Sequence, residues 1–392
     1  MKLRTVRDLD VKNKRVLLRV DYNVPISDGI VGDPLRIRAS FDTIRYLLSK
    51  NCSIVLISHM GRPKGKKAKE FSLCHVAQKA STMLGHHIGF VEDCIGRGAA
   101  ARAAHLKPGE IIMLENLRFH KEEEANDPKF AKELAELADV YIDDAFAAVH
   151  RAHASTVGVT KYLPAAAGLL VEREVKTITE ALEHPAKPLV AVVGGAKVST
   201  KIDTLNNLMK YADKIAIGGA MANTFLAAQG KKIGKSKHEA DRVKDAKKII
   251  ASAKREGVEL VIPTDVIVAK SLTQTKLGRL TDLNNVEADD YIVDLGPKTV
   301  AAILNPLDFH GSVIWNGPLG VAEIPAFAHA SLSLAHNIIE SGAKCIIGGG
   351  DTAAFVDDAG LHDKFAWVST GGGASLELMS GQKLPGLKAL QD

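Results

Sequence analysis

The segment 193–203, Val-Gly-Gly-Ala-Lys-Val-Ser-Thr-Lys-Ile-Asp, indicates the fold most clearly. It follows an apolar run, 188–193, whose length and composition predict a buried parallel strand. Two glycines then allow a sharp turn, and a helical pattern begins near Ser199. This arrangement favours an anion, because the first N–H groups of a helix are unpaired and the helix dipole is positive there. Since Lys197 and Lys201 stand one helical turn apart, we expect the segment to hold a phosphoryl group.

Apolar, β-branched runs alternate with helical patterns along the rest of the chain. Strands are predicted at 15–20, 53–58, 111–114, 140–142, 189–193, 214–218, 259–263, 312–315, 344–348 and 365–369. Helices are predicted at 35–50, 73–84, 128–138 and 169–183, with further helical segments between the later strands. Alternation of this kind is typical of parallel sheets covered by helices. Because so many strands exceed a comfortable single sheet, we predict an α/β fold of two doubly wound, Rossmann-like lobes.

The connection between the two lobes is expected at 169–187. It begins with the predicted helix 169–183, which the prolines Pro185 and Pro188 separate from the next strand. The predicted domains are therefore 1–168, the connecting helix and hinge 169–187, and 188–376.

Composition places the chain among soluble globular proteins. Of 392 residues, 46% are hydrophobic and 25% are charged. No apolar run is long enough to cross a bilayer, and no signal peptide is expected. Four cysteines without a C-x-x-C pair favour a reducing, cytoplasmic location. The net charge of +5 is modest and only 5% of residues are aromatic, so the lysine-rich stretches 64–69 and 231–237 favour solvated loops over a nucleic-acid surface.

Cationic side chains follow the strands of the first half. Arginine forks match carboxylate and phosphate oxygens, so such a cluster predicts a site for a small polyanion. The cluster consists of Arg36, His59, Arg62, Arg118 and Arg151, with Asp21 and Asn23 after the first strand. His150 and His153 are three apart, but no carboxylate or cysteine set completes a metal site around them, so we do not expect one.

Glycine turns and carboxylates follow the strands of the second half. The turn 348–352, Gly-Gly-Gly-Asp-Thr, follows a strand and opens a helix, where Asp351 is a candidate ligand for Mg²⁺. The turn 371–375, Gly-Gly-Gly-Ala-Ser, opens another helix, and Glu323 is a candidate partner of a ribose hydroxyl. The chain contains neither a P-loop, nor a protein-kinase signature, nor a dinucleotide fingerprint after an early strand.

Eight segments, in order, resemble those of the phosphoglycerate kinase family and cover nearly the whole chain. They are Arg19-Val-Asp-Tyr-Asn-Val-Pro25, Ser58-His-Met-Gly-Arg-Pro63, Glu115-Asn-Leu-Arg-Phe119, His150-Arg-Ala-His-Ala-Ser-Thr156, Gly194-Gly-Ala-Lys-Val-Ser199, Trp315-Asn-Gly-Pro-Leu-Gly320, Gly348-Gly-Gly-Asp-Thr352 and Ser369-Thr-Gly-Gly-Gly-Ala-Ser375. The resemblance implies reversible phosphoryl transfer between 1,3-bisphosphoglycerate and ADP, giving 3-phosphoglycerate and MgATP. It also implies a cytoplasmic enzyme of small molecules, which we expect to be a monomer with Mg²⁺ bound through its nucleotide.

The resemblance assigns roles to individual residues. The implied substrate-binding residues are Asp21, Asn23, Arg36, His59, Met60, Gly61, Arg62, Arg118 and Arg151. The implied nucleotide-binding residues are Gly194, Gly195, Lys197, Gly218, Gly317, Pro318, Glu323, Gly349, Gly350, Asp351 and Thr352, with Asp351 as the metal contact. The expected catalytic residues are Arg36, Lys197, Lys201, Gly372 and Gly373. The family's C-terminal tail returns to the first lobe, so we expect 377–392, and in particular 384–392, to pack there.

Three positions depart from the family pattern. Met60 stands where leucine is usual, Thr200 replaces a frequent aspartate, and Ala147-Ala148-Val149 replaces the usual Gly-Thr-Ala. None of these changes removes a charged group to which we assign chemistry. They bear on rate and on closure of the lobes more than on identity.

We hypothesise that Arg36 and Lys197 converge on the transferring phosphoryl group after the lobes close. Lys201 and the N–H groups of 372–374 would add to its stabilisation. Two alternatives stay open at this point. A nicotinamide dehydrogenase would need the missing dinucleotide fingerprint, and a non-catalytic protein would use its basic lobe to bind nucleic acid.

Overall fold

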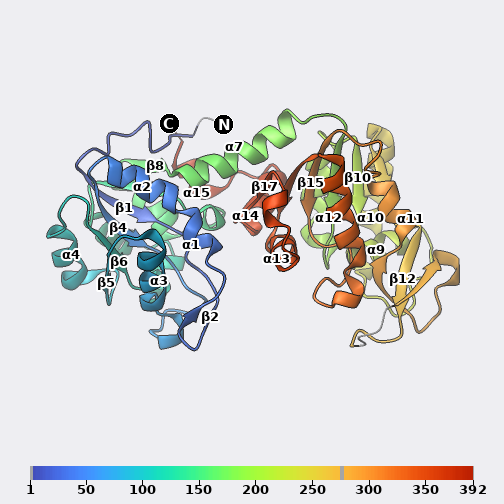
Figure 1. The fold of residues 1–392 in the computed structure, drawn as a ribbon, viewed down its shortest axis with the longest axis horizontal. Helices are drawn as coiled ribbons and strands as arrows, with labels where there is room; N and C mark the ends of the chain where they lie inside the picture. The colour runs from blue at the N-terminus through green and yellow to red at the C-terminus, as the bar shows by residue number, and fades with distance from the viewer. Residues whose placement is uncertain (1–2, 274–277, 392) are drawn as a thin grey trace. The chain divides into compact units, whose positions relative to one another are not determined.

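The computed structural model describes residues 3–273 and 278–391. They form two compact units, each built on its own parallel sheet (Figure 1). Unit 1 runs to Val175 and resumes at Lys383, and unit 2 is Lys176–Gln382. The predicted α/β class with two parallel-sheet lobes is confirmed. Every helix in the described residues is too short or too polar to span a bilayer.

Unit 1 contains a six-stranded sheet in which every neighbouring pair is parallel. The strands are β1 (Arg15–Arg19), β4 (Ser53–Ile57), β5 (Ile88–Val91), β6 (Ile111–Leu114), β7 (Val140–Asp143) and β8 (Ala165–Ala167). Their order in the sheet is β5-β6-β4-β1-β7-β8. The chain leaves β1 in one direction to β4 and later returns to its other side with β7. The carboxyl end of β1 is therefore a topological switch point, where ligands collect in open α/β sheets.

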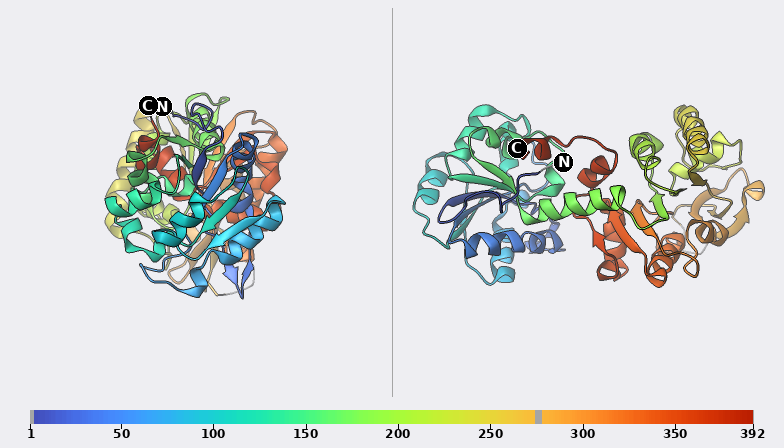
Figure 2. Two further views of the ribbon diagram at one scale, coloured as in Figure 1. Left: turned by 90° about the vertical axis from the view of Figure 1, so that its left-hand side faces the viewer. Right: turned by 90° about the horizontal axis from the view of Figure 1, so that it is seen from above.

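Helices cover both faces of this sheet (Figure 2). They are α1 (Leu35–Ala39), α2 (Phe41–Ser49), α3 (Cys74–Leu84), α4 (Gly96–Ala104), α5 (Lys121–Glu124) and α6 (Pro128–Ala135). Alternate strand residues such as Val16 and Leu18 form one core with Ile44 of α2 and Val76 of α3. Because successive strand residues point to opposite faces, Leu17 is buried against the other helical layer.

Several elements of unit 1 differ from expectation. The helix predicted at 35–50 is two helices, because the Ser40 hydroxyl lies 2.9 Å from the Ile37 carbonyl and 2.8 Å from the Tyr22 hydroxyl. Strands β5 and β8, helix α4 and a short hairpin of β2 (Ile26–Ser27) and β3 (Ile30–Val31) were not predicted.

Unit 2 contains a second six-stranded parallel sheet. Its strands are β9 (Leu189–Val193), β10 (Lys214–Ile217), β11 (Glu259–Val261), β15 (Ser312–Asn316), β16 (Lys344–Gly348) and β17 (Trp367–Val368). Their order is β11-β10-β9-β15-β16-β17, which places the switch point between β9 and β15. Val193, Asn316 and Gly348 lie in register across three neighbouring strands. The turns that follow these strands therefore lie side by side.

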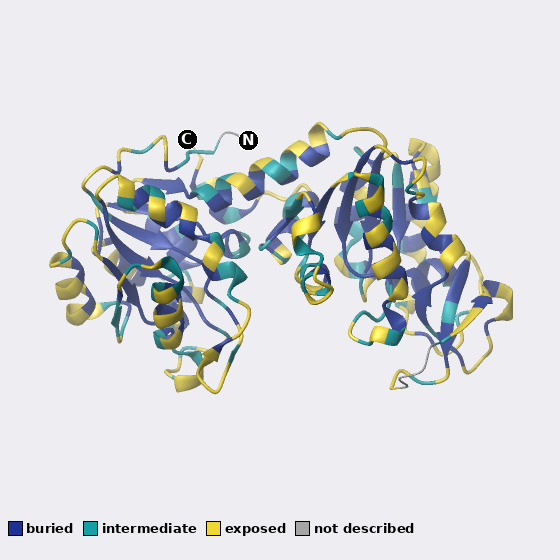
Figure 3. Cartoon of the chain, viewed as in Figure 1, coloured by how far each residue is buried: buried dark blue, intermediate teal, exposed yellow. Residues whose placement is uncertain are grey.

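The helices of unit 2 pack their apolar stripes on this sheet and expose their polar faces, as the burial colours of Figure 3 show. They are α8 (Ile202–Leu208), α9 (Met221–Ala228), α10 (Val243–Glu256), α11 (Pro297–Ile303), α12 (His329–Ser341), α13 (Gly350–Asp358) and α14 (Gly373–Met379). Trp315, fully buried at the centre of the sheet, shares a core with Leu334 of α12 and Val356 of α13.

An antiparallel sheet in unit 2 corrects the expectation of parallel sheets alone. It joins β12 (Asp265–Ala269), β13 (Arg279–Asp282) and β14 (Tyr291–Leu295) in the order β13-β12-β14. β13 is exposed at most of its positions, so it lacks the apolar run on which the prediction relied.

Helix α7 (Leu169–Glu183) begins where expected, and the division between the units falls within it. Asp144 fixes its first turn, because one carboxylate oxygen accepts the N–H of Leu170 at 2.8 Å and of Val171 at 3.4 Å. The Thr43 hydroxyl accepts the N–H of Leu169 at 3.0 Å. The start of the helix is thus held by unit 1.

The C-terminal segment belongs to unit 1 from Lys383 onward, later in the chain than residue 377. It contains α15 (Pro385–Ala389), and Leu387 is fully buried there. The N–H of Gly386 donates to the Val149 carbonyl at 2.8 Å, and Leu3 forms a bridge with Gln391.

Candidate active site

Arg36, Asp21, Asn23 and Gly61 meet at the carboxyl ends of β1 and β4 in unit 1. Arg36 Nη1 lies 3.1 Å from a carboxylate oxygen of Asp21 and donates to the Asn23 carbonyl at 3.1 Å. Asn23 Oδ1 accepts the N–H of Gly61 at 2.9 Å. Gly61 has φ +57°, and a Cβ there would lie 2.3 Å from the Phe71 ring, so this turn requires glycine. Four of the residues expected to bind substrate thus form one connected group.

Asn116, which follows β6, ties this group to Arg118. Its side-chain amide accepts the N–H of Met60 at 3.1 Å and donates to the Met60 carbonyl at 2.8 Å. This pair of hydrogen bonds resembles the pair that links two residues on neighbouring β-strands. The same oxygen accepts the N–H of Arg118 at 3.0 Å. Arg118 Nη1 then donates to the Gly61 carbonyl at 2.8 Å. Asn116 is fully buried and was not among the predicted site residues.

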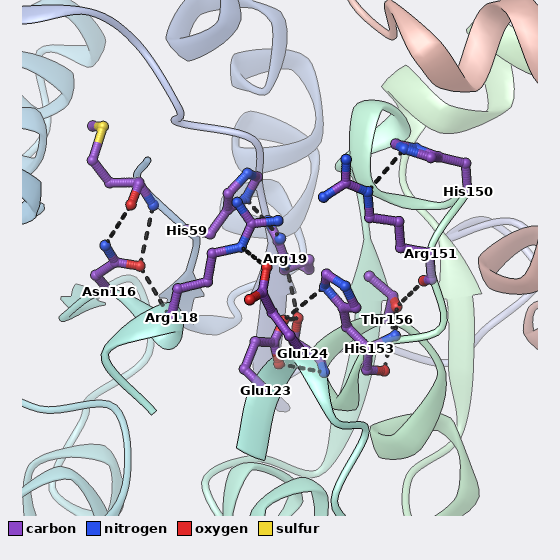
Figure 4. Close-up of polar contacts among 12 residues, drawn as sticks. Arg19, His59, Asn116, Arg118, Glu123, Glu124, His150, Arg151, His153 and Thr156 are labelled. Carbon is purple, nitrogen blue, oxygen red and sulfur yellow. Dashed lines mark hydrogen bonds and ion pairs between the residues drawn. The ribbon is translucent and has the colours of Figure 1, made fainter. Parts of the chain in front are cut away.

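A buried polar network lies beside these residues (Figure 4). Arg19, at the end of β1, contacts His59 and Ser155, and Ser155 contacts Glu123. Figure 4 shows His153 directed at Glu123, with 3.7 Å between His153 Nδ1 and the carboxylate. Neither Arg19 nor Glu123 was predicted as a site residue, although Arg19 stands in the first family segment.

Positive charge is concentrated at this end of unit 1. Burial lowers the pKa of Arg118, which the nearby cations Arg19 and Arg151 also lower while Glu124 raises it. Arg151 Nε donates to His150 Nε2 at 3.0 Å, and Arg62 is exposed at the start of its loop. Repulsion among crowded cations is relieved by a bound anion, so the cluster favours a polyanionic ligand.

Two glycine turns meet at the switch point of unit 2. A Cβ on Gly194 would lie 2.1 Å from the Pro318 carbonyl oxygen, and a Cβ on Gly317 would lie 2.3 Å from the Gly194 carbonyl oxygen. A Cβ on Gly219 would lie 2.5 Å from the Gly195 backbone. The backbones after β9, β10 and β15 therefore approach too closely for side chains, which leaves their peptide groups as the surface offered to a ligand.

The helix expected near Ser199 begins later than predicted. Val198–Thr200 is a 3₁₀ turn and α8 starts at Ile202, so Lys197 and Lys201 stand before the two helical segments and not within one helix. Glu239 holds the turn, because its carboxylate accepts the Ser199 hydroxyl at 2.6 Å and the Ser199 N–H at 3.0 Å.

Lys201 and Lys197 differ in their surroundings. The Lys201 ammonium contacts Asn316 Oδ1, at the end of β15. Burial lowers the pKa of Lys201 to about 8, and the charge of Asp351 partly offsets that shift. Lys197 is exposed. Lys201 is thus a partly desolvated cation, whose attraction for a phosphate oxygen is stronger than that of a lysine in water.

A cavity of about 460 Å³ lies beside the turn after β15. Pro318, Glu323 and Asp351 line it together with apolar residues of α12 and α13, including Leu332 and Phe355. Its size and apolar walls suit a nucleoside, with the carboxylates at its polar positions.

The turn after β16 is fixed to this group. Thr352 Oγ1 accepts the N–H of Gly317 at 2.6 Å, and a Cβ on Gly349 would lie 3.0 Å from Asn316 Nδ2. Gly372, before α14, lies near Gly350, since its Cβ would be 3.7 Å from the Gly350 nitrogen. The structure therefore brings the predicted nucleotide-binding turns together at one edge of the sheet.

Comparisons with known proteins identify the family. The family model for phosphoglycerate kinase matches residues 6–382. Phosphoglycerate kinase from Moorella thermoacetica is 48% identical over 388 residues, covering 99% of each chain, and that from Pelotomaculum thermopropionicum is 46% identical over 392 residues, covering 100% of each.

Two solved structures share the whole fold. Phosphoglycerate kinase from Coxiella burnetii superposes with a TM-score of 0.89 at 41% identity, covering 99% of each chain. The enzyme from Pyrococcus horikoshii OT3 has a TM-score of 0.86 at 30% identity, covering 99% of this chain and 98% of that one.

The fold and these matches define a two-domain α/β phosphotransferase, a kinase whose acceptor is a carboxyl group. Within that class, the chain belongs to the phosphoglycerate kinase family. These matches support neither the dehydrogenase nor the nucleic-acid-binding alternative.

Proposed function

We propose that this chain transfers a phosphoryl group reversibly between 1,3-bisphosphoglycerate and ADP. In the direction of ATP formation, the bond from phosphorus to the carboxyl oxygen breaks, and a bond to a β-phosphate oxygen of ADP forms. The main support for this proposal is that the two units contain different kinds of ligand-binding groups. Unit 1 offers a crowded cationic cluster around Arg36 and Arg118, whereas unit 2 offers glycine turns, the partly buried Lys201 and a nucleoside-sized cavity.

The cluster of unit 1 is the proposed site of 3-phosphoglycerate and 1,3-bisphosphoglycerate. Arg118 and Arg151 supply forks for phosphate or carboxylate oxygens, and the exposed Arg62 adds a third. Asp21 and Asn23 accept hydrogen bonds, which suits the hydroxyl of a glycerate. The backbone of Met60 and Gly61 completes the pocket wall.

The turns of unit 2 are the proposed nucleotide site. The apolar cavity takes the nucleoside, and Glu323 at its rim is a candidate acceptor for ribose hydroxyls. The backbone at 194–195, 218 and 349–352, with Lys197, takes the phosphates.

Asp351 is the proposed contact for Mg²⁺. Its carboxylate is exposed at the cavity rim on the first turn of α13, and Mg²⁺ in kinases is held by one or two carboxylates plus substrate phosphates. The residues present therefore fit the ion. When bound, it neutralises charge on the nucleotide phosphates.

Catalysis in this proposal needs no strong base, because an acyl phosphate is already a reactive donor. Arg36, Lys197 and Lys201, with the backbone at Gly372 and Gly373, stabilise charge on the transferring group. We propose that closure about 169–187 unites the two sites and excludes water, which would otherwise hydrolyse the acyl phosphate. We also propose that the enzyme is cytoplasmic and monomeric.

A coupled assay with 3-phosphoglycerate and MgATP tests the function. ADP release that requires 3-phosphoglycerate, and that collapses in Lys197→Ala, is the expected result. Lys248→Ala removes an exposed lysine on α10 of the same unit and should keep full activity. Absence of 3-phosphoglycerate-dependent turnover in the folded wild type would overturn the proposal.

A further inference from the structure

Arg19 is a buried arginine that reaches His59. Its side chain is 1% exposed, and Nη2 lies 3.0 Å from His59 Nδ1. Nε donates to Ser155 Oγ at 3.1 Å, and Nη1 donates to the Val20 carbonyl. Three groups in different directions thus hold the guanidinium in one orientation.

Only one assignment of donor and acceptor is possible for the hydrogen bond between Arg19 and His59. A guanidinium carries donors and no acceptor, so His59 Nδ1 must accept the hydrogen bond with its lone pair. An imidazole with an unprotonated Nδ1 is neutral and carries its proton on Nε2. A protonated ring would instead set an N–H against an N–H.

Glu123 and Ser155 fix Arg19 from the other side. Ser155 has one hydroxyl proton, which it donates to Glu123 Oε1 at 2.6 Å, so toward Arg19 its oxygen can only accept. The N–H of Ser155 donates to the second carboxylate oxygen at 2.9 Å. Burial raises the pKa of Glu123, but the contacts with His153, Arg19 and Ser155 outweigh it and bring the pKa below its usual range. Glu123 is therefore a buried counter-charge of Arg19, and Asp143, opposite Arg19 on β7, is a second buried carboxyl group near it.

The charges around His59 agree with a neutral ring. Burial first, and then the electrostatic effects of Arg19, Arg118, Arg36 and His153, hold the pKa of His59 well below its usual range. These groups face the ring from β1, from the turn after β6, from α1 and from the segment after β7. The carboxylates nearby are already engaged, since Asp21 pairs with Arg36 and Glu123 accepts Ser155.

We infer that Arg19 is a positioning residue that fixes His59 as the neutral Nε2–H tautomer. His59 then offers one N–H, on the edge of the ring away from Arg19, to an acceptor oxygen. In the substrate site proposed above, on which this last step rests, that acceptor is a carboxylate or phosphate oxygen. His59 thus binds as a neutral donor of fixed direction and neither as a cation nor as an acid.

Long-range ¹H–¹⁵N correlation spectra of the histidine-labelled full chain test the tautomer without any substrate. The protein has 14 histidines, and His59→Gln identifies the signals that belong to His59. The expected result is a ring protonated on Nε2 alone, unchanged between about pH 5 and 8. A ring protonated on Nδ1, or on both nitrogens at neutral pH, would overturn the inference.

Variants test whether Arg19 is the cause. In Arg19→Lys the charge remains but the fork is lost, so we expect the two tautomers to mix. In Arg19→Met we expect mixing and also a pKa that rises toward the ordinary histidine range. Because a lone Glu123 carboxylate can prevent folding, Arg19→Met is also made together with Glu123→Gln, which removes both charges. Arg15→Met changes an arginine at the opposite end of the same strand and should leave His59 unchanged. A pure Nε2–H tautomer in every Arg19 variant would show that Arg19 does not set it.

Kinetics separate this inference from the proposed function. If the wild type uses 3-phosphoglycerate, kcat/KM for that substrate should gain a pH dependence between about pH 5 and 8 in the double variant that neither the wild type nor Arg15→Met shows. A wild type with the expected tautomer but no activity would overturn the proposed function and leave the role of Arg19 intact. Activity in a wild type whose His59 shows another tautomer would support the proposed function and overturn the role of Arg19.

Discussion

The site proposed in unit 1 consists mainly of charged side chains, whereas the site proposed in unit 2 consists chiefly of backbone. In unit 1 the guanidinium group of Arg36 is held by the buried carboxylate of Asp21, and that of Arg118 donates to the Gly61 carbonyl. In unit 2 the turns are held by direct contact between backbones at Gly194 and Gly317, and few side chains intervene. The arrangement in unit 1 depends on charged side chains that have polar partners, whereas the arrangement in unit 2 depends on glycines that lack a Cβ atom. The two sites should therefore fail under different substitutions.

Removal of the buried counter-charge in unit 1 should have the largest effect on stability. Glu123 is 0% exposed, so Glu123→Ala removes a buried counter-charge from Arg19 and should cost about 3–5 kcal/mol. Glu124 is 48% exposed in its pair with Arg118, so Glu124→Ala should cost less than about 1 kcal/mol. Urea unfolding followed by circular dichroism measures both. Equal effects from these adjacent glutamates would show that the network does not support unit 1.

Removal of a cationic side chain should damage chemistry without damaging the fold. Arg36 is 33% exposed and stands at the rim of its cluster, so Arg36→Ala should lower kcat by about 10²–10³-fold with little change in Tm. Arg38→Ala, an exposed arginine on the same helix, is the matched control and should keep normal turnover. Near-normal kcat in Arg36→Ala would contradict the proposed role in charge stabilisation.

A single methyl group should suffice to damage unit 2. The Cβ of Gly194→Ala would meet the carbonyl oxygens of Gly317 and Pro318, so the turns must separate at a cost of about 1–3 kcal/mol. The affinity of this variant for nucleotide, measured by calorimetry, should be lower than that of the wild type. At Gly350 nothing lies within 4 Å of an added Cβ, so Gly350→Ala should keep the stability of the wild type. If both variants are equally stable, close backbone approach does not shape this site.

The smallest effect concerns Lys201, the partly buried lysine of the site proposed in unit 2. The pKa of Lys201 is about 8, so kcat/KM for MgATP should fall as pH rises through that value, to about a tenth of its plateau one pH unit higher. Lys201→Arg keeps the positive charge at high pH, so in this variant kcat/KM should no longer fall over this pH range. The free energy of unfolding should change in the opposite direction and rise over the same pH range. From about pH 8 to 10.5 the unfolded chain binds a proton at Lys201 that the folded chain does not, and stability rises with pH wherever this is so. A flat profile in the wild type would mean that Lys201 keeps its proton throughout.

The sequence predicted the central strands well and the peripheral elements poorly. The runs at 111–114, 189–193 and 344–348 match β6, β9 and β16 residue for residue, because strands buried on both faces are largely apolar. Among these residues only Lys344, the first residue of β16, is exposed. In contrast, β8 is an alanine run and β13 is mostly exposed, so neither carries that signal. Their strand geometry comes from pairing with neighbours that a local pattern does not contain.

The candidate site was predictable where its residues stand in short ordered segments. Arg36, Arg118 and the glycine turns follow strands and match family segments, so their side chains or backbones were expected at the sheet edges. Asn116, Arg19 and Glu123 were not selected, because their importance lies in buried partners distant in sequence. Arg19 and Ser155, for example, are 136 residues apart. Only the fold shows that these polar side chains are removed from water and must satisfy one another.

The return of the C-terminal segment to unit 1 has a consequence for synthesis on the ribosome. Leu387 is fully buried in unit 1, directly after Gly386, whose N–H bonds to Val149, yet it is translated only after all of unit 2. The part of the chain that is made first is therefore the last to be completed. A nascent chain exposes the apolar surface that α15 will cover for as long as unit 2 takes to emerge, which makes that surface the natural point of contact for a chaperone.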